Sequence, residues 1–308
     1  MDVTTYTQSN CKNAFVDSSI PDVCLKEPCV VGVDEAGRGP VLGPMVYGIC
    51  FCPVTRHEDL KKAGVADSKT LKKEAREEIF DIIDSKNDFI GWALEIISPV
   101  FITTNSFARP KVSLNEVSHN SAIGLIKRAI AAGVQVSEVY VDTVGRPEKY
   151  QAKLEQVFPT LKVTVAIKAD SKFPCVSGAS ICAKVARDKA LAEWEFPEGT
   201  EILTDWGSGY PNDDKAKNFL QNSLDPIFGF PDIVRFSWDT AVKLIEKKCV
   251  TMSWNENDEE QENKTPSILE YYAKSVKRKS SDNDPPPPAV LKKHFFFSER
   301  SLSNSTDF

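Results

Sequence analysis

Between residues 29 and 192, short runs rich in β-branched residues alternate with longer segments whose apolar residues recur at helical spacing. This alternation favours an α/β architecture, in which helices cover the faces of a central sheet. The loop after the first strand is short, so the first two strands are expected to pair as an antiparallel hairpin. We predict strands at 29–35, 44–53, 88–99, 138–145 and 162–170, and helices at 68–85, 114–133, 147–158 and 175–196.

Composition divides the chain into four parts. Residues 1–27 are expected to form an irregular N-terminal lead-in, and residues 28–198 the α/β domain. Residues 199–254 are expected to form a helical C-terminal region, with a helix at 239–249. From residue 255 to residue 308 the chain is polar, charged or proline-rich, which predicts a disordered tail.

Charge and cysteine content narrow the classes of protein to consider. The net charge of −6 is not that of a strongly basic nucleic-acid binder, so contacts with phosphates would need a local patch, a metal or a partner. No run of eighteen apolar residues predicts a membrane span, and the N-terminus does not resemble a secretory signal. The eight cysteines form no CxxC pair, which indicates reduced thiols in an intracellular protein, with Cys50 and Cys52 as core residues.

Three of the predicted strands carry carboxylates toward their ends. Asp34 and Glu35 follow the run VVGV, Asp142 follows VYV, and Asp170 follows VTVAIKA. Ligand sites in sheets with parallel main strands gather at the carboxyl ends of those strands. If the three strands are neighbours, four carboxylates converge, and their mutual repulsion favours a divalent cation with oxygen ligands, Mg²⁺ or Mn²⁺.

Each of these acids has a simpler interpretation when taken alone. An aspartate after a strand commonly caps the local backbone of a turn. The four acids together, with VDEAGRG around two of them, are not ordinary turn chemistry and favour the metal site. Two metals bridged by such carboxylates are the usual apparatus of phosphodiester hydrolysis.

Two loops carry features of phosphate binding. Gly37 and Gly39 let backbone amides approach a ligand closely, and Arg38 between them can make paired hydrogen bonds to a phosphate. A tight turn with a solvated arginine is the alternative. Ser68 and Lys69, at an expected helix start, offer a hydroxyl, a cation and backbone amides, although Ser68 could be a simple N-cap.

The helix predicted at 175–196 carries polar residues at spacings of three and four, which place them near one face. Ser180, Lys184 and Arg187 on this face suit phosphate contacts, because the helix begins just after Asp170. A solvated helix face is the competing interpretation.

Six ordered motifs within residues 28–250 resemble those of the type 2 ribonucleases H: VGVDEAGRGPVLGPMV, ADSKTL, VYVDTVG, KAD, SICAKVARD and GSGYP. The resemblance implies a ribonuclease H-like α/β fold, with a mixed five-stranded sheet flanked by helices and a helical C-terminal extension. It implies Asp34, Glu35, Asp142 and Asp170 as catalytic metal ligands, Gly37, Arg38 and Gly39 as the substrate loop, and Tyr210 as the reader of the RNA–DNA junction. Gly178 departs from the family pattern, where alanine is expected.

The resemblance also implies an activity. Members of this family hydrolyse the phosphodiester 5′ of ribonucleotides, in RNA–DNA hybrids and at single ribonucleotides embedded in duplex DNA, with two divalent ions. The ends produced are 3′-hydroxyl and 5′-phosphate, and the roles are ribonucleotide removal from DNA and RNA primer removal. The alternatives are another metal nuclease of the same fold and a hybrid-binding scaffold that has lost catalysis.

Partners and location are predicted from the resemblance and from short segments of the chain. Eukaryotic members of the family act with two non-catalytic subunits, B and C, and we expect a docking surface around Phe228, Phe230 and Phe236, although these could equally be core. In the tail, Ile268, Tyr271 and Tyr272 have the spacing of a sliding-clamp-binding peptide, with Thr265 in place of the usual glutamine. The basic residues 277–279 suggest localisation in the nucleus.

Overall fold

A mixed sheet of six strands, in the order β1-β4-β3-β2-β5-β6, forms the centre of the molecule. The computed structural model describes residues 1–65, 72–196 and 205–251. β2 pairs antiparallel with β3 and parallel with β5, which in turn pairs parallel with β6. The strands are β1 (Ala14–Asp17), β2 (Cys29–Ala36), β3 (Met45–Pro53), β4 (Gly91–Ile97), β5 (Val136–Asp142) and β6 (Lys162–Ala166).

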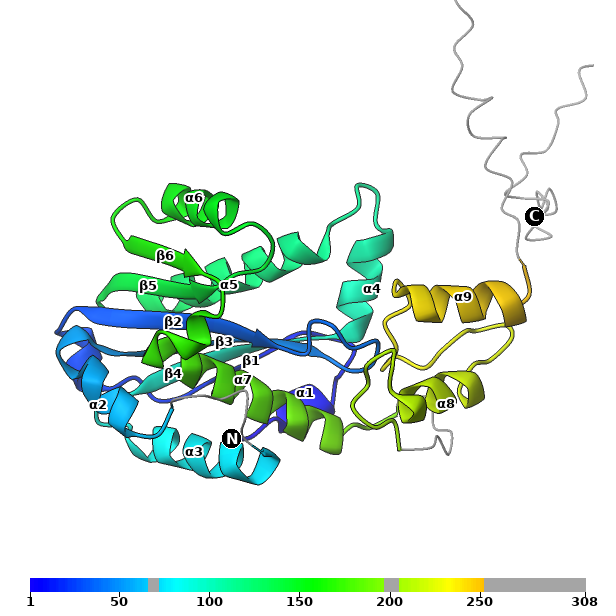
Figure 1. Ribbon diagram of the computed structural model, residues 1–308, viewed down its shortest axis with the longest axis horizontal. Helices are drawn as coiled ribbons and strands as arrows, with labels where there is room; N and C mark the ends of the chain where they lie inside the picture. The colour runs from blue at the N-terminus through cyan, green and yellow to red at the C-terminus, as the bar shows by residue number, and fades with distance from the viewer. Residues whose placement is uncertain (66–71, 197–204, 252–308) are drawn as a thin grey trace, which may run out of the picture. The chain divides into compact units, whose positions relative to one another are not determined.

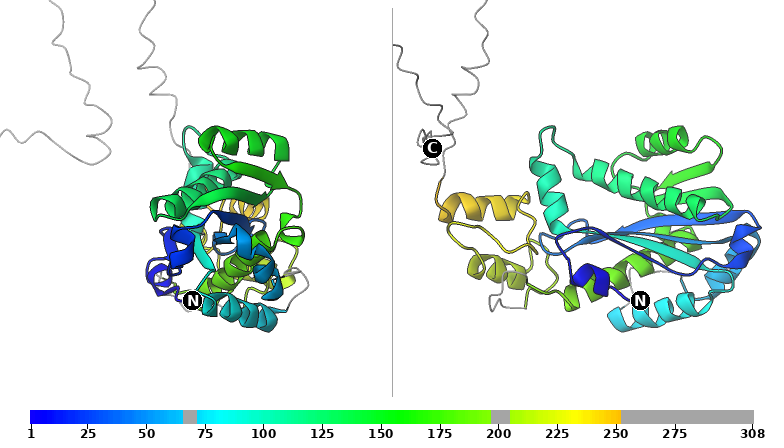
Figure 2. Two further views of the ribbon diagram at one scale, coloured as in Figure 1. Left: turned by 90° about the vertical axis from the view of Figure 1, so that its left-hand side faces the viewer. Right: turned by 180° about the vertical axis from the view of Figure 1, so that it is seen from behind.

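Helices cover both faces of this sheet (Figures 1 and 2). The helices of the α/β part are α2 (His57–Lys62), α3 (Lys73–Ser85), α4 (Pro99–Phe107), α5 (Leu114–Ala131), α6 (Pro147–Val157) and α7 (Pro174–Ala192), with 3₁₀ turns η2 (Val54–Arg56) and η3 (Ala169–Ser171). One apolar core lies between the sheet and α5 and α6, and a second lies between the sheet and α3 and α7. No helix of the described residues is long and apolar enough to cross a membrane.

The predicted hairpin and α/β alternation are confirmed, and the helices predicted at 114–133 and 147–158 match α5 and α6 to within two residues. The helix predicted at 175–196 ends earlier, at Ala192, and α3 begins at Lys73, while residues 68–71 of its predicted range lie outside the described part of the chain. Pro147 stands in the first turn of α6, and Gly133, with a φ of 97°, follows the end of α5. All eight cysteines are free thiols, and Cys50 and Cys52 are buried core residues as predicted.

The count of five strands is wrong, and so is the irregular lead-in. Residues 1–27 contain α1 (Thr4–Thr7), β1 and the 3₁₀ turn η1 (Asp22–Leu25), and β1 pairs antiparallel with β4 as the sixth strand. β1 has only four residues, Ala14–Asp17, which is too short a pattern to predict a strand by itself. Its stability comes from the backbone hydrogen bonds that the edge of β4 offers.

The C-terminal region contains two helices, α8 (Asp214–Asn222) and α9 (Asp239–Lys248), within the compact unit Met1–Thr251. The three phenylalanines expected at a docking surface differ in their surroundings. Phe228 is 84% exposed, whereas Phe230 is buried and packs edge-on against the half-buried Phe236. Phe230 and Phe236 therefore belong to the packing of this region.

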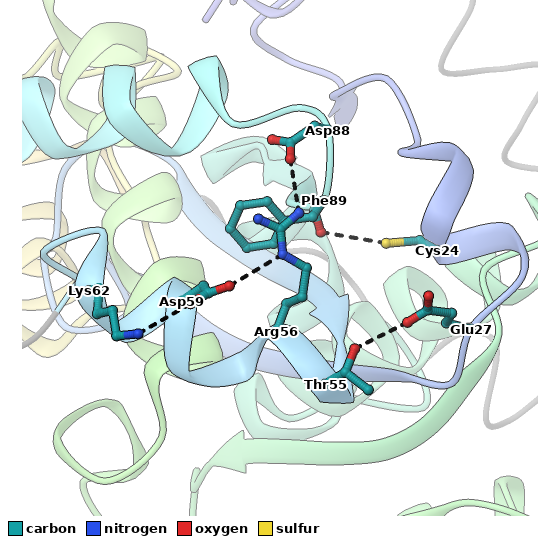
Figure 3. Close-up of polar contacts among 8 residues, drawn as sticks. All are labelled: Cys24, Glu27, Thr55, Arg56, Asp59, Lys62, Asp88 and Phe89. Atoms are coloured by element: carbon teal, nitrogen blue, oxygen red, sulfur yellow. Dashed lines mark hydrogen bonds and ion pairs between the residues drawn. The ribbon is translucent and has the colours of Figure 1, made fainter.

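Arg56 links several segments at the end of the sheet where β2 begins and β3 ends (Figure 3). The guanidinium of Arg56 lies 3.5 Å above the ring centre of Phe89 and pairs with Asp88 at 2.9 Å and Asp59 at 3.4 Å. The thiol of Cys24 donates to the Phe89 carbonyl, so η1 and η2 both contact the turn before β4. Asp34 and Glu35 lie at the other end of β2.

Candidate active site

The strand β2 places its two acids on opposite faces of the sheet. Side chains alternate along a strand, so Asp34 points to α7, where the Ser180 hydroxyl contacts it, while Glu35 points to the α5 side. β5 runs parallel to β2 with Val33 opposite Val141, which brings Asp142 beside Asp34. Asp170 lies in η3, between β6 and α7.

Backbone amides hold the three aspartates in place. The Oδ1 atoms of Asp34 and Asp170 each accept a hydrogen bond from the amide of the following residue, at 2.8 and 3.0 Å. Oδ1 of Asp142 accepts from the amide of Ala169 at 2.8 Å, which ties the end of β5 to η3. The site is therefore assembled from two strands and the turn that leads into α7.

Burial makes negative charge costly here. Burial raises the pKa of Asp34 to about 7, an effect that the Ser180 hydrogen bond opposes and the charges of Asp142 and Asp170 increase. Burial also raises the pKa of Glu35 to about 8, with further contributions from the charges of Asp34 and Asp142. Carboxylates that raise one another's pKa in this way are stabilised in their charged form by a cation.

The donor set fits a hard divalent cation. All four groups are carboxylates, the ligands that Mg²⁺ and Mn²⁺ prefer, and Oε2 of Glu35 is buried without a hydrogen-bond partner among the described residues. Within the described ranges, no three His, Cys, Asp or Glu side chains already converge on one ion position. The backbone thus brings the four carboxylates to one edge of the sheet.

The loop after β2 is supported by two buried arginines. Arg235 donates to the carbonyl oxygens of Gly37, Arg38 and Gly43 at 2.6, 3.1 and 2.9 Å. Arg187 donates to those of Leu42 and Pro44 at 3.3 and 3.2 Å. Burial, followed by the charge of Arg187, lowers the pKa of Arg235 to about 9.

Both glycines of this loop are needed for close contacts. Gly37 has a φ of 76°, and a Cβ there would lie 2.1 Å from Nε of Arg187. A Cβ on Gly39 would lie 3.0 Å from the ring of Tyr210, which is 49% exposed. The structure therefore brings Gly37, Arg38, Gly39 and Tyr210 together beside the carboxylates, with Arg38 near enough to Glu35 to lower its pKa.

Comparison with known proteins identifies the family. The sequence model of the ribonuclease HII family matches residues 31–241. The chain is 51% identical to the A subunit of ribonuclease H2 from Mus musculus over 273 residues, which cover 88% of this chain and 91% of that protein. The chain belongs to the ribonuclease HII family.

Solved structures of ribonucleases H2 and HII agree with this family assignment. Ribonuclease H2 from Pyrococcus horikoshii has a TM-score of 0.59 at 31% identity and covers 71% of this chain and 98% of its own. Ribonuclease HII from Archaeoglobus fulgidus, solved in complex with PCNA, has a TM-score of 0.58 at 29% identity and covers 74% of this chain and 99% of its own. As a member of this family, the chain is a ribonuclease with an α/β fold.

Two residues expected to contact phosphate have other surroundings in this ribonuclease. Ser180 is buried and hydrogen-bonds to Asp34, and Arg187 is buried and bonds to loop carbonyls. Ser180 thus supports Asp34, and Arg187 supports the glycine loop, because their face of α7 packs against the sheet and this loop. Lys184 is half-buried, and its phosphate contact stays a prediction, while Ser68 and Lys69 lie outside the described residues.

Three contributors were not recognised from the sequence. Arg235 supports the glycine loop from the far C-terminal region, and no local pattern marks it. Asn115 and His119, one turn apart on α5, contact Arg38 and stack on Tyr150, respectively. The sequence shows that Asn115 and His119 lie on the same side of the helix, because they are four residues apart.

We expect Arg235→Lys to destabilise the protein and disorder the glycine loop. A lysine keeps the charge but cannot reach three carbonyls at once, and each buried carbonyl left without a donor costs about 1–3 kcal/mol. Denaturant unfolding should show this loss. Arg128→Lys, in a surface pair with Asp17, is the matched control and should change stability by less than about 1 kcal/mol. Equal stability of the two variants would contradict the supporting role of Arg235.

Proposed function

We propose that this ribonuclease is the catalytic subunit of an enzyme that hydrolyses the phosphodiester 5′ of ribonucleotides. Its substrates are RNA–DNA hybrids and duplex DNA with a single embedded ribonucleotide, and the ends produced are 3′-hydroxyl and 5′-phosphate. The observation that carries the proposal is the juxtaposition of Asp34, Glu35, Asp142 and Asp170 with the Gly37–Arg38–Gly39 loop and Tyr210. Such an enzyme would act in ribonucleotide removal from DNA and in RNA primer removal.

The four carboxylates would hold two divalent ions, Mg²⁺ or Mn²⁺. When bound, such ions supply an activated water and stabilise the leaving 3′ oxygen. The residues of the chain would hold and orient the carboxylates that bind these ions. Asp34 and Asp142, anchored by backbone amides, present their carboxylates beside one another, and the Ser180 hydroxyl orients Asp34 from the α7 side.

The glycine loop is suited to recognise the ribonucleotide. Only a 2′-hydroxyl distinguishes RNA from DNA at a given position, and reading it needs polar groups held at short range. The carbonyls of Gly37 and Arg38 are fixed from behind by Arg235, so the loop is preorganised. Tyr210, half-exposed against Gly39, is suited to stack on the sugar where RNA passes into DNA.

We further propose that the chain docks onto non-catalytic subunits B and C through the C-terminal region. The turn between Asp225 and Gly229 carries Ile227, 75% exposed, and Phe228, and the amide of Val250 donates to the Pro226 carbonyl at 2.9 Å. Val250 is itself 62% exposed, so three large apolar side chains adjoin on the surface. Adjoining exposed apolar residues of this kind mark interaction sites.

Two proposals concern residues outside the described part of the chain. Ile268, Tyr271 and Tyr272 would bind a sliding clamp, and a family relative solved in complex with PCNA supports a partner of this kind. Residues 277–279 would direct the protein to the nucleus.

The competing function is a hybrid-binding scaffold without catalysis, or a nuclease of this fold that cuts DNA alone. A cleavage assay on the complex co-expressed with subunits B and C separates these, with an embedded ribonucleotide and an all-DNA duplex as substrates. The proposal expects cleavage of the first only, in Mg²⁺ and not with a chelator. Cutting of both duplexes, or of neither, would reject it.

Asp34→Ala should abolish cleavage and leave the fold intact. The substitution removes a proposed metal ligand. Because burial raises the pKa of Asp34, its negative charge is unfavourable in the metal-free fold, and its removal should not destabilise that fold. Cleavage of the embedded-ribonucleotide duplex and a circular dichroism melting curve measure the two effects. Asp88→Ala, which removes an aspartate at the opposite end of the sheet, should cleave normally. Normal turnover by Asp34→Ala would refute the assignment of the metal site.

Tyr210→Ala should impair cleavage at single ribonucleotides more than cleavage of long hybrids. A long hybrid offers many sites without a junction, whereas a single ribonucleotide always has one. Loss of an aromatic stacking contact of about 1–3 kcal/mol predicts a decrease of roughly 5- to 150-fold in kcat/KM for the embedded substrate. Equal losses on both substrates would argue against junction reading.

Replacing both Ile227 and Phe228 by serine should weaken assembly with subunits B and C. The two side chains lie in solvent, so the melting temperature of the chain alone should hardly change. Co-purification of the three chains measures assembly. Exposed Phe107, replaced by serine, is the matched control on another part of the surface and should assemble normally. A double variant that assembles as well as this control would disprove the surface.

A further inference from the structure

Polar groups gather behind Glu35, in the layer between the sheet and helices α5 and α6. Four buried side-chain atoms in this layer have no hydrogen-bond partner among the described residues: Glu35 Oε2, Tyr47 Oη, Ser118 Oγ and Tyr150 Oη. Nearly all buried polar groups in folded proteins have a partner. Three such hydroxyls beside a carboxylate whose own Oε2 lacks a partner therefore indicate a shared role.

Strand register places Tyr47 next to Glu35. The two residues are direct partners across β2 and β3, with their side chains on the same face of the sheet. Directly opposite residues of antiparallel strands have Cβ atoms about 4.5–5.5 Å apart. The hydroxyl of Ser118 lies beside that of Tyr47, outside hydrogen-bond geometry.

Tyr150 reaches the same place from α6. Its ring stacks on His119 of α5, with ring centres 3.8 Å apart and an angle of 14° between the planes. Burial, and after it the charge of Glu35, raises the pKa of Tyr150, and the same two causes raise that of Tyr47. Both phenols thus remain protonated and can donate a hydrogen bond.

Tyr47 has a second carboxylate opposite it, Glu95 of β4. Both oxygens of Glu95 are already used, since Oε1 accepts from Asn13 Nδ2 at 3.2 Å and Oε2 accepts from the Ser121 hydroxyl. Of the two carboxylates opposite Tyr47, Glu35 is the one with an oxygen that has no donor among the described residues. The three aspartates of the site differ from Glu35, because backbone amides of other residues hold them.

We infer that Tyr47 and Tyr150 are positioning residues whose hydroxyls donate hydrogen bonds to Oε2 of Glu35 when a divalent cation binds, and so direct its other oxygen to that cation. The inference rests on the proposed metal-dependent function. Groups that hydrogen-bond to a metal ligand from behind typically contribute about 10–100-fold in metal affinity or activity. The two tyrosines would thus donate hydrogen bonds to Glu35, as backbone amides do to the three aspartates and as the Ser180 hydroxyl does to Asp34.

The test measures Mn²⁺ binding to the full-length chain by titration calorimetry, with the metal-free melting temperature as the measure of folding. Tyr47→Phe and Tyr150→Phe keep the rings and remove only the hydroxyls. Each should weaken Mn²⁺ binding by about 10–100-fold with little change in melting temperature. Tyr140→Phe is the matched control, since its hydroxyl bonds to Glu138 at 2.6 Å and lies away from Glu35, and it should bind Mn²⁺ normally.

A double-mutant cycle shows whether the effect passes through Glu35. In the Glu35→Gln background, Tyr47→Phe should cause no further loss of Mn²⁺ affinity. Normal affinity of both single tyrosine variants, or an equally large loss in both backgrounds, would overturn the inference. Failure of the unsubstituted chain to bind Mn²⁺ would instead overturn the metal-dependent function, and this inference with it.

Discussion

The close approach of α7 to the middle of the sheet is the contact on which the site depends. A Cβ on Gly32 of β2 would lie 2.1 Å from the backbone of Cys175, and one on Gly48 of β3 would lie 2.9 Å from the carbonyl of Ala179. Both strands therefore carry glycine under the helix. This contact places the Ser180 hydroxyl against Asp34 and fixes η3, with Asp170, at the start of α7. Gly178 belongs to the same contact, because a methyl group there would lie 2.9 Å from the Cys50 sulfur.

Next to this contact, the two faces of β2 give Asp34 and Glu35 different surroundings. Asp34 faces α7 and is held by a hydroxyl and an amide, whereas Glu35 faces two tyrosines and the polar residues of α5. The loop proposed for recognition follows the strand directly and is supported by Arg187 and Arg235, whose guanidinium groups bond to neutral carbonyls. Two of the carboxylates proposed for cleavage and the loop proposed for recognition thus lie on one continuous segment, residues 34–44.

Much of this arrangement could be predicted. Alternating strand and helix periodicities indicated the α/β class, and the acids at strand ends, with the parallel neighbours β2, β5 and β6, predicted the cluster. The positions of Ser180 and Arg187 could not be predicted, because helical spacing says which residues share a face but not what that face touches. The strand β1 could not be predicted, because its stability comes from backbone pairing with β4 and not from its own four residues.

The sequence by itself determined which residue types are available and on which strands, since side-chain periodicity and local turn chemistry are properties of neighbouring residues. It thus determined the fold class, the four acids and the glycine loop. Only the tertiary structure decided what supports them. Arg235 lies 198 residues along the chain from Gly37, whose carbonyl it holds, and Tyr47 and Tyr150 lie near Glu35 although they belong to different elements. Such contacts depend on burial and on packing between distant segments, which no local pattern records.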